Sequence, residues 1–452
     1  MRAFLQQPLP GFNANVLLPR SALGNGSNSV EEQDRRIHEW YRFVLSFPPH
    51  LVRRYLGEFN LGPDAVILDP FCGTGTTLVE AKLGHFQSIG VEAHPFSHFV
   101  SSAKVNWNID PHELLRTAKD IADSLLATFE AQGINDNLPF QGNLQSLDLP
   151  QLEPSRQKLL IKDSISPLPL RKTLALFSRI EAYGSTPYYP HLKLALAKAL
   201  VFSISNLRFG PEVGIGKVKD DAPVVLPWLH EVHAIADDLV SLAQRDSYPQ
   251  SVVYLNDSRA IDIFLPRQSV DAVITSPPYP NEKDYTRTTR LESVLLGFIK
   301  SQKELRTYKR ELMRSNTRGV YKADTDDLWI QDFPEILQLA EAIESRRKEL
   351  GKTSGFERLY SRVTKLYFGG MARHLTSLRP VLKPGAKLAY VVGDQASYLR
   401  IMIRTGALLA DIAARIGYQV ERIDLFRTRF ATATQEELRE EVLILTWPGE
   451  LD

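Results

Sequence analysis

Two short motifs, about 200 residues apart, carry the residue types with the clearest chemistry in this chain. The first, Asp69-Pro-Phe-Cys-Gly-Thr-Gly75, follows the apolar run Ala65-Val-Ile-Leu68 and has two glycines spaced by one residue. The second, Thr275-Ser-Pro-Pro-Tyr279, follows Val270-Asp-Ala-Val-Ile274 and combines a hydroxyl group, two prolines and an aromatic ring. The first motif suits the binding of a nucleoside-containing cofactor, and the second suits the binding of a planar exocyclic amine.

The glycine motif has the features of a ligand-binding turn at the end of a buried strand. Glycines there let the backbone turn sharply and approach a ligand closely. No third glycine and no Lys-Ser/Thr pair follow, so a phosphate-binding P-loop is not predicted. Glu92 ends the next apolar run, 17 residues after Gly75, and its carboxylate can accept hydrogen bonds from both hydroxyls of a ribose. The alternative is a plain strand–helix turn with Glu92 on the surface.

Asp257 ends a third apolar run, Ser251-Val-Val-Tyr-Leu255, and is followed by Ser258. Because the carboxyl ends of parallel strands meet at one edge of a sheet, Asp257 can lie beside the glycine motif and accept a hydrogen bond from an adenine amine. The alternative is that Asp257 only caps the helix that follows it.

The proline motif favours recognition of an amino group. Two adjacent prolines fix the backbone and remove two N–H donors, so the local carbonyl groups have no neighbouring donor. Ser276 Oγ and the Pro277 carbonyl can accept the two protons of an incoming NH₂ group, which draws the nitrogen lone pair out of conjugation and directs it at a methyl sulfonium. Tyr279 offers a ring face for stacking on a base. The alternative is a proline-rich turn with no chemical role.

The periodicity of the chain predicts an α/β fold around these motifs. Residues 65–92 have the order strand, glycine turn, helix, strand, which is a βαβ unit. A turn is predicted at Leu382-Lys-Pro-Gly385 and a helix at Arg400–Ile416. A helix is also predicted to begin near Val30 and a second one at Phe47. Further strands are predicted at 251–255, 270–275, 387–392, 419–426 and 441–447.

Composition limits the class of protein. The 452 residues are 43% hydrophobic and 24% charged, with a formal net charge of +1, as in ordinary globular enzymes. A single cysteine excludes a disulfide framework, and the ten histidines show no metal-ligand spacing, so no metal site is predicted. No apolar run reaches the roughly 18 residues that a membrane span needs. The first residues lack a signal-peptide pattern, so a cytoplasmic protein without a membrane partner is expected.

With both motifs in place, the chain resembles the S-adenosylmethionine-dependent, amino-methylating DNA methyltransferases, the cytosine-N4 and adenine-N6 family. Phe71-Cys-Gly-Thr-Gly75 is similar to their cofactor motif, and Ser276-Pro-Pro-Tyr279 to their catalytic tetrapeptide. The resemblance implies a Rossmann-like, doubly wound and mostly parallel sheet with two mainly helical insertions. It implies catalytic roles for Ser276, Pro277, Pro278 and Tyr279, and cofactor binding by Phe47, Pro48, Asp69, Pro70, Phe71, Cys72, Gly73, Gly75, Thr76, Glu92 and Asp257.

The resemblance also implies a substrate. A serine in the first place of the tetrapeptide is similar to the cytosine-N4 enzymes, and the partner would be double-stranded DNA with the target base flipped out of the duplex. A role in a restriction-modification system or in a related defence or epigenetic system is expected, with a cognate restriction endonuclease as a candidate partner. Neither the presence of that partner nor the oligomeric state is predicted. The alternatives are adenine-N6 methylation of DNA, guanine-N2 methylation of RNA, and an inactive cofactor-binding module associated with DNA. C5-cytosine chemistry is excluded, because the only cysteine, Cys72, lies inside the cofactor turn.

The regions outside the two motifs divide the chain. The predicted catalytic domain combines residues 31–105, 251–299 and 363–452, and residues 1–30 form a flexible segment. Residues 106–250 are predicted to be a helical insertion and a candidate for target recognition. Residues 300–362 are predicted to be a basic helical insertion and a candidate for DNA contact. From Lys300 to Lys322, eight basic residues face two acidic ones, which fits either phosphate contact or a solvated helix with ion pairs four residues apart.

Overall fold

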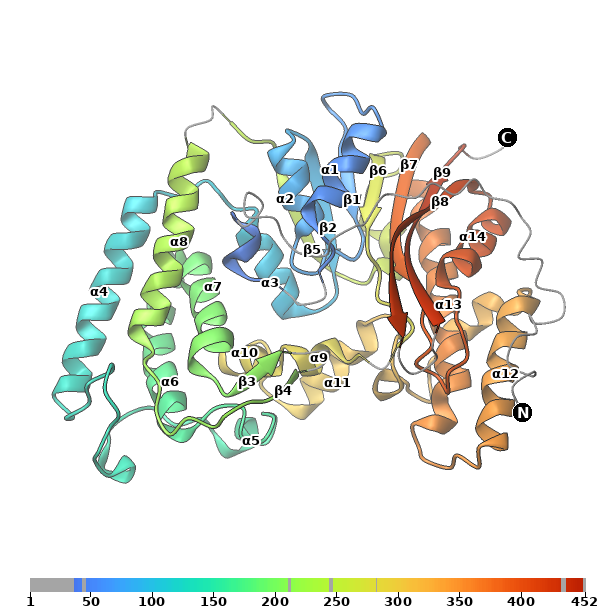
Figure 1. Ribbon diagram of the computed structural model, residues 1–452. Helices are drawn as coiled ribbons and strands as arrows, with labels where there is room; N and C mark the ends of the chain where they lie inside the picture. Colours follow the sequence, from blue (N-terminus) through green and yellow to red (C-terminus); the bar gives the residue numbers. More distant parts are fainter. Residues whose placement is uncertain are drawn as a thin grey trace.

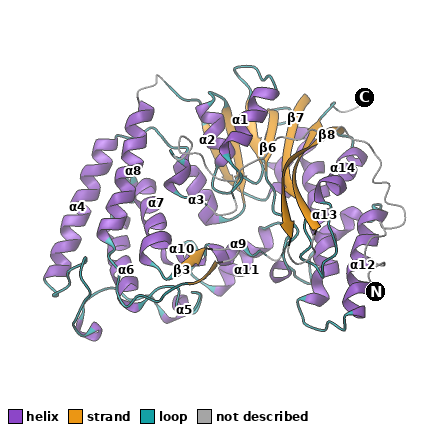
Figure 2. Cartoon of the chain, in the orientation of Figure 1, coloured by secondary structure: helices purple, strands orange, loops and turns teal. Residues whose placement is uncertain are grey.

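The computed structural model describes residues 36–42, 46–209, 213–243, 247–281, 283–431 and 436–449. The predicted flexible segment, residues 1–30, lies outside these ranges. At the centre of the molecule is a seven-stranded sheet in the order β5-β2-β1-β6-β7-β9-β8 (Figures 1 and 2). Its strands are β1 (Val66–Asp69), β2 (Gln87–Glu92), β5 (Ser251–Leu255), β6 (Val270–Thr275), β7 (Leu382–Gly393), β8 (Gln419–Ala431) and β9 (Glu436–Thr446).

The strand order places the two motifs next to each other. Strands β5, β2, β1, β6 and β7 are parallel, and β9 runs antiparallel to both β7 and β8. From β1 the chain moves outward through β2 and β5, and then returns to place β6 on the other side of β1. The boundary between β1 and β6 is therefore the topological switch point, where ligands bind in open α/β sheets. The prediction of a Rossmann-like, mostly parallel α/β sheet is confirmed.

Alternating side chains of the central strands pack against different helices. Ile67 and Ile274 belong to a core with α1 (Pro49–Glu58) and α2 (Thr76–Leu83), whereas Leu68 and Val273 belong to a core with α13 (Tyr360–Leu378) and α14 (Thr405–Ile416). Both faces of the sheet are thus covered, which explains why these strands are almost entirely apolar. Proline at the first position of α1 is tolerated because its missing N–H would have no partner there.

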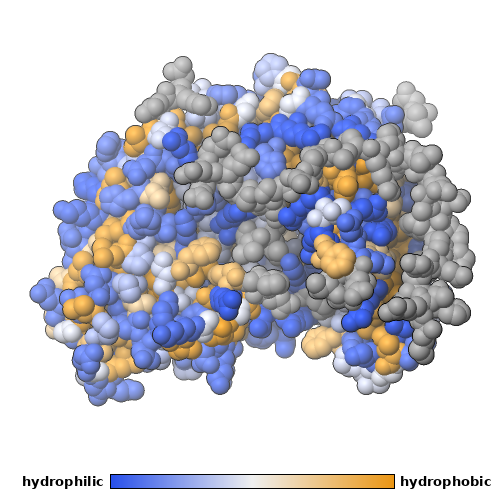
Figure 3. Space-filling view, viewed as in Figure 1, coloured by the Kyte–Doolittle hydropathy of each residue, from blue (hydrophilic) through white to orange (hydrophobic). Residues whose placement is uncertain are grey.

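Between β2 and β5 the chain forms a helical region, on the left in Figure 1. Its core is continuous with side chains of α2 and α3, so this region packs directly on the sheet domain. The visible face of the molecule is mostly hydrophilic, with apolar residues scattered over it (Figure 3). The elements of the region are α3 (Pro95–Lys104), α4 (Pro111–Glu130), α5 (Pro154–Gln157), α6 (Pro167–Glu181), α7 (Tyr189–Ala199), the π-helix Leu200–Ile204, the hairpin β3 (Leu207–Phe209) and β4 (Val213–Ile215), and α8 (Val225–Ala243).

Between β6 and α13 lie four further helices, α9 (Tyr285–Thr288), α10 (Arg290–Leu295), α11 (Gln302–Glu311) and α12 (Pro334–Glu349). The basic segment predicted as one stretch from Lys300 to Lys322 is α-helical as far as Glu311 and then contains a short 3-10 helix at Thr317–Gly319. Its remainder runs along the edge of the main cavity. Within the described ranges, no helix is long and apolar enough to cross a membrane, and no cluster of His, Cys, Asp or Glu side chains could hold a metal ion.

Three predicted elements differ from the structure. In place of the helix expected from Val30, the described part of that segment has only a 3-10 helix at His38–Trp40. The helix expected from Arg400 begins at Thr405, because Arg400 has a φ of 65°, in the left-handed region. The turn expected at Leu382–Gly385 lies inside β7, where Gly385 has a φ of 84° and the pairing with β6 shifts register.

Candidate active site

Both sequence motifs open on one cavity of about 620 Å³, a volume typical of ligand pockets. The turn after β1 and the turn after β6 form two of its walls, as the switch-point topology requires. Of the fifteen predicted site residues, thirteen line it: Phe47, Pro48, Pro70, Phe71, Cys72, Gly73, Thr76, Glu92, Asp257, Ser276, Pro277, Pro278 and Tyr279. The structure therefore brings together residues that lie up to about 230 positions apart in the chain.

The other two predicted residues, Asp69 and Gly75, support the cavity from outside its lining. Asp69 is fully buried, and its Oδ1 accepts hydrogen bonds from Thr275 Oγ1 at 2.6 Å and from the backbone N–H of Phe71 at 3.1 Å. One carboxylate thus fastens the glycine turn to the strand that leads into the proline turn. Burial raises the pKa of Asp69 to about 6, although these hydrogen bonds act in the opposite direction. Gly75, with a φ of 85°, precedes the first residue of α2.

Glu92 is built into the glycine turn in a way that suits a ribose. Its Oε2 accepts from the Gly73 N–H at 2.9 Å and its Oε1 from the His94 N–H at 2.7 Å. Each oxygen retains a further lone pair, and the side chain lies on the cavity wall. Burial raises the pKa of Glu92 to about 7, so a pair of donors from a bound ligand would stabilise its charged form. The residues present therefore fit an adenosyl cofactor with its ribose hydroxyls at Glu92.

Asp257 lines the same cavity but already has protein partners. Its Oδ1 accepts from the backbone N–H of Arg259 at 2.9 Å, and the Arg259 guanidinium pairs with both carboxylate oxygens. Asp257 is therefore the N-cap of a 3-10 helix, as one of the two sequence interpretations has it. Arg259 also contacts Asp326, which connects the end of β5 to the region before α12.

The proline turn presents acceptors to the cavity. Within the described ranges the carbonyl of Pro277 has no hydrogen-bond partner, as expected where neighbouring donors are missing. The turn is closed by the Asn281 N–H, which donates to the Tyr279 carbonyl at 2.8 Å. The Tyr279 ring packs so closely on Gly393 that a Cβ there would lie 3.0 Å from ring atom Cε2. Gly393 therefore fixes the ring of Tyr279 beside Ser276.

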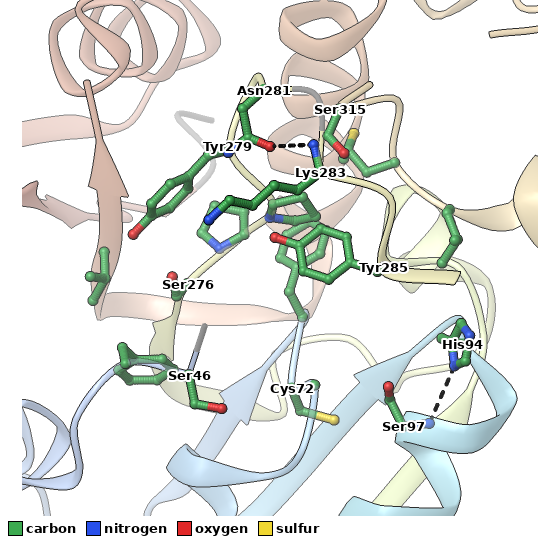
Figure 4. Close-up of a pocket in the computed structure, with 18 of the residues that line it drawn as sticks. Ser46, Cys72, His94, Ser97, Ser276, Tyr279, Asn281, Lys283, Tyr285 and Ser315 are labelled. Atoms are coloured by element: carbon green, nitrogen blue, oxygen red, sulfur yellow. Dashed lines mark hydrogen bonds between the residues drawn. The ribbon is translucent and has the colours of Figure 1, made fainter. Parts of the chain in front are cut away.

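The residues after the proline turn complete the wall above Ser276. Figure 4 shows Tyr279, Lys283 and Tyr285 on one side of Ser276, with Cys72 on the other. The Lys283 N–H donates to Asn281 Oδ1 at 3.0 Å, which holds this segment in a tight turn. Burial raises the pKa of Tyr285 to about 12, and nearby Glu92 acts in the same direction. Tyr285 is therefore a neutral aromatic ring at the cavity.

Several further segments that the motifs did not indicate also line the cavity, and two of them carry paired charges. One is the end of α11, where Lys309 pairs with Asp284 at 2.7 Å. The other is the β8–β9 hairpin, where Arg427 makes a two-point contact with Glu440, at 2.7 and 2.9 Å. The basic character of residues 300–322 partly indicated the first of these segments. No sequence pattern marks the hairpin, because its place depends on the pairing of β9 with β7.

Comparisons with known proteins show which proteins this chain is similar to. Residues 24–101 match the model of a family described as DNA methylase. The chain is 27% identical to the Type II methyltransferase M.BsoBI of Geobacillus stearothermophilus, over 89% of this chain and 83% of that protein. It is 24% identical to the Type II methyltransferase M.AvaI of Nostoc sp., over 88% of this chain and 82% of that protein. Among solved structures, TrmN from Thermus thermophilus aligns over 91% of this chain and 52% of its own, at 11% identity and a TM-score of 0.31, which is too distant to support any conclusion.

The predicted relationship to the amino-methylating DNA methyltransferases is thereby confirmed, and with it the dependence on S-adenosylmethionine. The comparisons do not distinguish cytosine-N4 from adenine-N6 enzymes.

Proposed function

We propose that this protein methylates the exocyclic N4 amine of a cytosine that is flipped out of double-stranded DNA. The observation that carries the proposal is the single cavity shared by the glycine turn after β1 and the proline turn after β6. A cofactor site and an amine site in one cavity are what a direct methyl transfer requires, because donor and acceptor must meet in line. Flipping is needed because the amine is out of reach inside a duplex.

In this proposal each wall of the cavity has its own task. S-adenosylmethionine supplies the electrophilic methyl group, and Glu92 accepts hydrogen bonds from the ribose hydroxyls. Ser276 Oγ and the Pro277 carbonyl accept the two amine protons, which leaves the nitrogen lone pair free to attack. With the cofactor bound, the nitrogen would gain a bond to the methyl carbon, and the carbon–sulfur bond would break with its electron pair left on the sulfur. The nitrogen would then lose one proton to water by way of Ser276 Oγ. Tyr279 and Tyr285 supply ring faces for the base.

The preference for cytosine rests on Ser276 as the first residue of the tetrapeptide, through its similarity to the cytosine-N4 enzymes. Adenine-N6 methylation stays the nearest alternative, since the same two acceptors can bind an adenine amine. The relatives named above are Type II methyltransferases, and we extend to this chain a DNA substrate, a restriction-modification role with a cognate endonuclease, and a cytoplasmic location.

The test is the transfer of labelled methyl groups. The purified protein is incubated with labelled S-adenosylmethionine and either double-stranded DNA or tRNA, and the nucleic acid is recovered and counted. The proposal expects label in DNA and none in tRNA. Label in tRNA alone would overturn it in favour of RNA methylation. Cofactor binding without transfer to either nucleic acid would indicate the inactive module.

A further inference from the structure

A second cavity, of about 480 Å³, lies beside the active-site cavity and shares Asp284 with it. Its wall is formed by two segments that are distant in sequence, the loop 158–162 after α5 and residues 284–290 after the proline turn, together with Arg318. Arg290 joins the two segments, because its Nη1 donates to the Leu159 carbonyl at 3.4 Å. In Figure 1, α5 and α9–α11 gather in the same lower part of the molecule. The cavity is therefore a junction between the helical region and the segment that follows the catalytic turn.

The lining of this cavity carries an excess of positive charge. Asp284 is its sole acidic lining residue, and Asp284 already pairs with Lys309 at 2.7 Å. Five cationic side chains line it: Lys158, Lys162, Arg287, Arg290 and Arg318. Across the described ranges, neither Arg287 nor the two lysines forms an ion pair with a carboxylate. Arg318 makes a cation–π contact with the ring of Phe356.

The five cationic side chains are exposed or half-buried, which contrasts with buried cations that have carboxylate partners. Lys172, for example, is fully buried between Asp136 and Asp221, at 3.0 and 2.7 Å. In the second cavity, burial lowers the pKa of Arg290, and the charge of Arg287 acts in the same direction while Asp284 opposes it. An anion in the cavity would relieve this repulsion. The five cations therefore share one lining carboxylate, Asp284, whose charge Lys309 already offsets, so an anion in the cavity would meet a positively charged lining.

We propose that this basic cavity, formed by Lys158, Lys162, Arg287, Arg290 and Arg318, binds a backbone phosphate of the DNA strand that carries the target base. The inference rests on the proposed function, because it takes the base to occupy the adjoining cavity. A flipped nucleotide stays bonded to the phosphates on either side of it, so a phosphate site must lie close to the base site. Guanidinium groups suit phosphate oxygens because they can donate two parallel hydrogen bonds.

The phosphate site gives a shared role to the two predicted insertions. Lys158 and Lys162 belong to the region 106–250, and Arg318 belongs to the region 300–362. Contacts to phosphate fix the register and orientation of the duplex without reading its sequence. In this account both insertions hold the target strand at the mouth of the active site, and base-specific contacts come from other residues.

The test uses the double variant Lys158→Gln/Lys162→Gln, because both side chains are exposed and neither belongs to the catalytic or cofactor-binding machinery. The matched control is Lys119→Gln/Lys348→Gln, which removes two exposed lysines on α4 and α12, far from the cavity. Binding of a fluorescein-labelled DNA duplex is measured by anisotropy between about 50 and 200 mM salt. Each lost phosphate contact should reduce the slope of log K against log salt by about 0.9 and weaken binding by about eightfold near 0.1 M salt.

A slope that is unchanged in the Lys158/Lys162 variant, or reduced equally in the control, would overturn the phosphate site. The assay needs no catalysis, so it separates this inference from the proposed function. Wild-type protein that binds the duplex with the expected loss in the variant supports the site, even where the labelled-methyl experiment fails. Methylation of DNA together with an unchanged slope in the variant overturns the site alone.

Discussion

The affinity for S-adenosylmethionine should increase with pH through neutrality, because Glu92 must be charged to accept two hydrogen bonds from a ribose. Burial raises the pKa of Glu92 to about 7 in the free protein, and the neighbouring charge of Asp69 contributes to the shift, while the N–H groups of Gly73 and His94 oppose it. At one pH unit below that pKa about one molecule in eleven has a charged Glu92, and at one unit above it about ten in eleven do. The apparent affinity scales with the competent fraction, so it should rise about tenfold, or ~1.4 kcal/mol, between about pH 6 and pH 8.

The direction of this pH dependence follows from which protonation state of Glu92 binds the cofactor. Ribose hydroxyls are donors to the carboxylate, so the cofactor binds the deprotonated form and lowers the pKa of Glu92. Binding near pH 7 should therefore release about half a proton to the buffer. Isothermal titration calorimetry in buffers of different ionisation enthalpy measures both the affinity and the proton release.

Glu92→Gln is the matched control, since it keeps the size of the side chain and removes the ionisation. Its affinity should be lower and independent of pH over the same range. A wild-type affinity that does not change with pH would refute the assignment of Glu92 to the ribose. So would a pH dependence that persists in Glu92→Gln, because another group would then be titrating.

Four other single substitutions test further parts of the site and of the fold. Ser276→Ala and Tyr279→Ala should each reduce kcat by about 100-fold or more while calorimetry shows cofactor affinity within about twofold of wild type, and loss of cofactor binding in both would show that the proline turn is misassigned. Asp69→Asn removes a carboxyl whose pKa is raised from 3.8 to about 6 in the folded protein. Because the folded protein binds this proton more tightly, the free energy of unfolding of the wild type should fall by ~3 kcal/mol as the pH rises from about 4 to 6. Urea unfolding of Asp69→Asn should not show this fall. Arg259→Met removes the cation that pairs with both Asp257 and buried Asp326, while Asp326 keeps its contact with Arg373 at 3.3 Å. The variant should lower the free energy of unfolding by about 3 kcal/mol, an effect that Asp326→Asn in the same chain should partly reverse.

Much of the sheet could be predicted because its central strands are buried on both faces. Val66–Asp69 and Val270–Thr275 therefore read as nearly continuous apolar runs, and each ends in residues with distinctive backbone chemistry. Since parallel strands present their carboxyl ends at one edge, the meeting of the two turns followed from the fold class. Eleven of the predicted site residues line the cavity for this reason, whereas Phe47 and Pro48 line it from the segment before α1.

The features that could not be predicted depend on contacts between distant segments, which leave no pattern in the local sequence. In the sequence, Asp69 has the position of a ligand-binding acid. In the structure its carboxylate accepts hydrogen bonds from Thr275 and from the backbone N–H of Phe71, and the contact with Thr275 depends on the pairing of β1 with β6. The place of Arg427 and Glu440 at the cavity depends on the antiparallel pairing of β9. The helix expected at Arg400 is shortened by a left-handed residue that apolar periodicity cannot reveal.

We propose that the shared cavity methylates an exocyclic amine and that Ser276 selects cytosine as the base. Mass spectrometry of nucleosides from DNA treated with the protein and S-adenosylmethionine measures the product directly. The account predicts N4-methylcytosine, absent from DNA treated with Ser276→Ala. N6-methyladenine would contradict the choice of base, and 5-methylcytosine or unmodified DNA would contradict amine methylation itself.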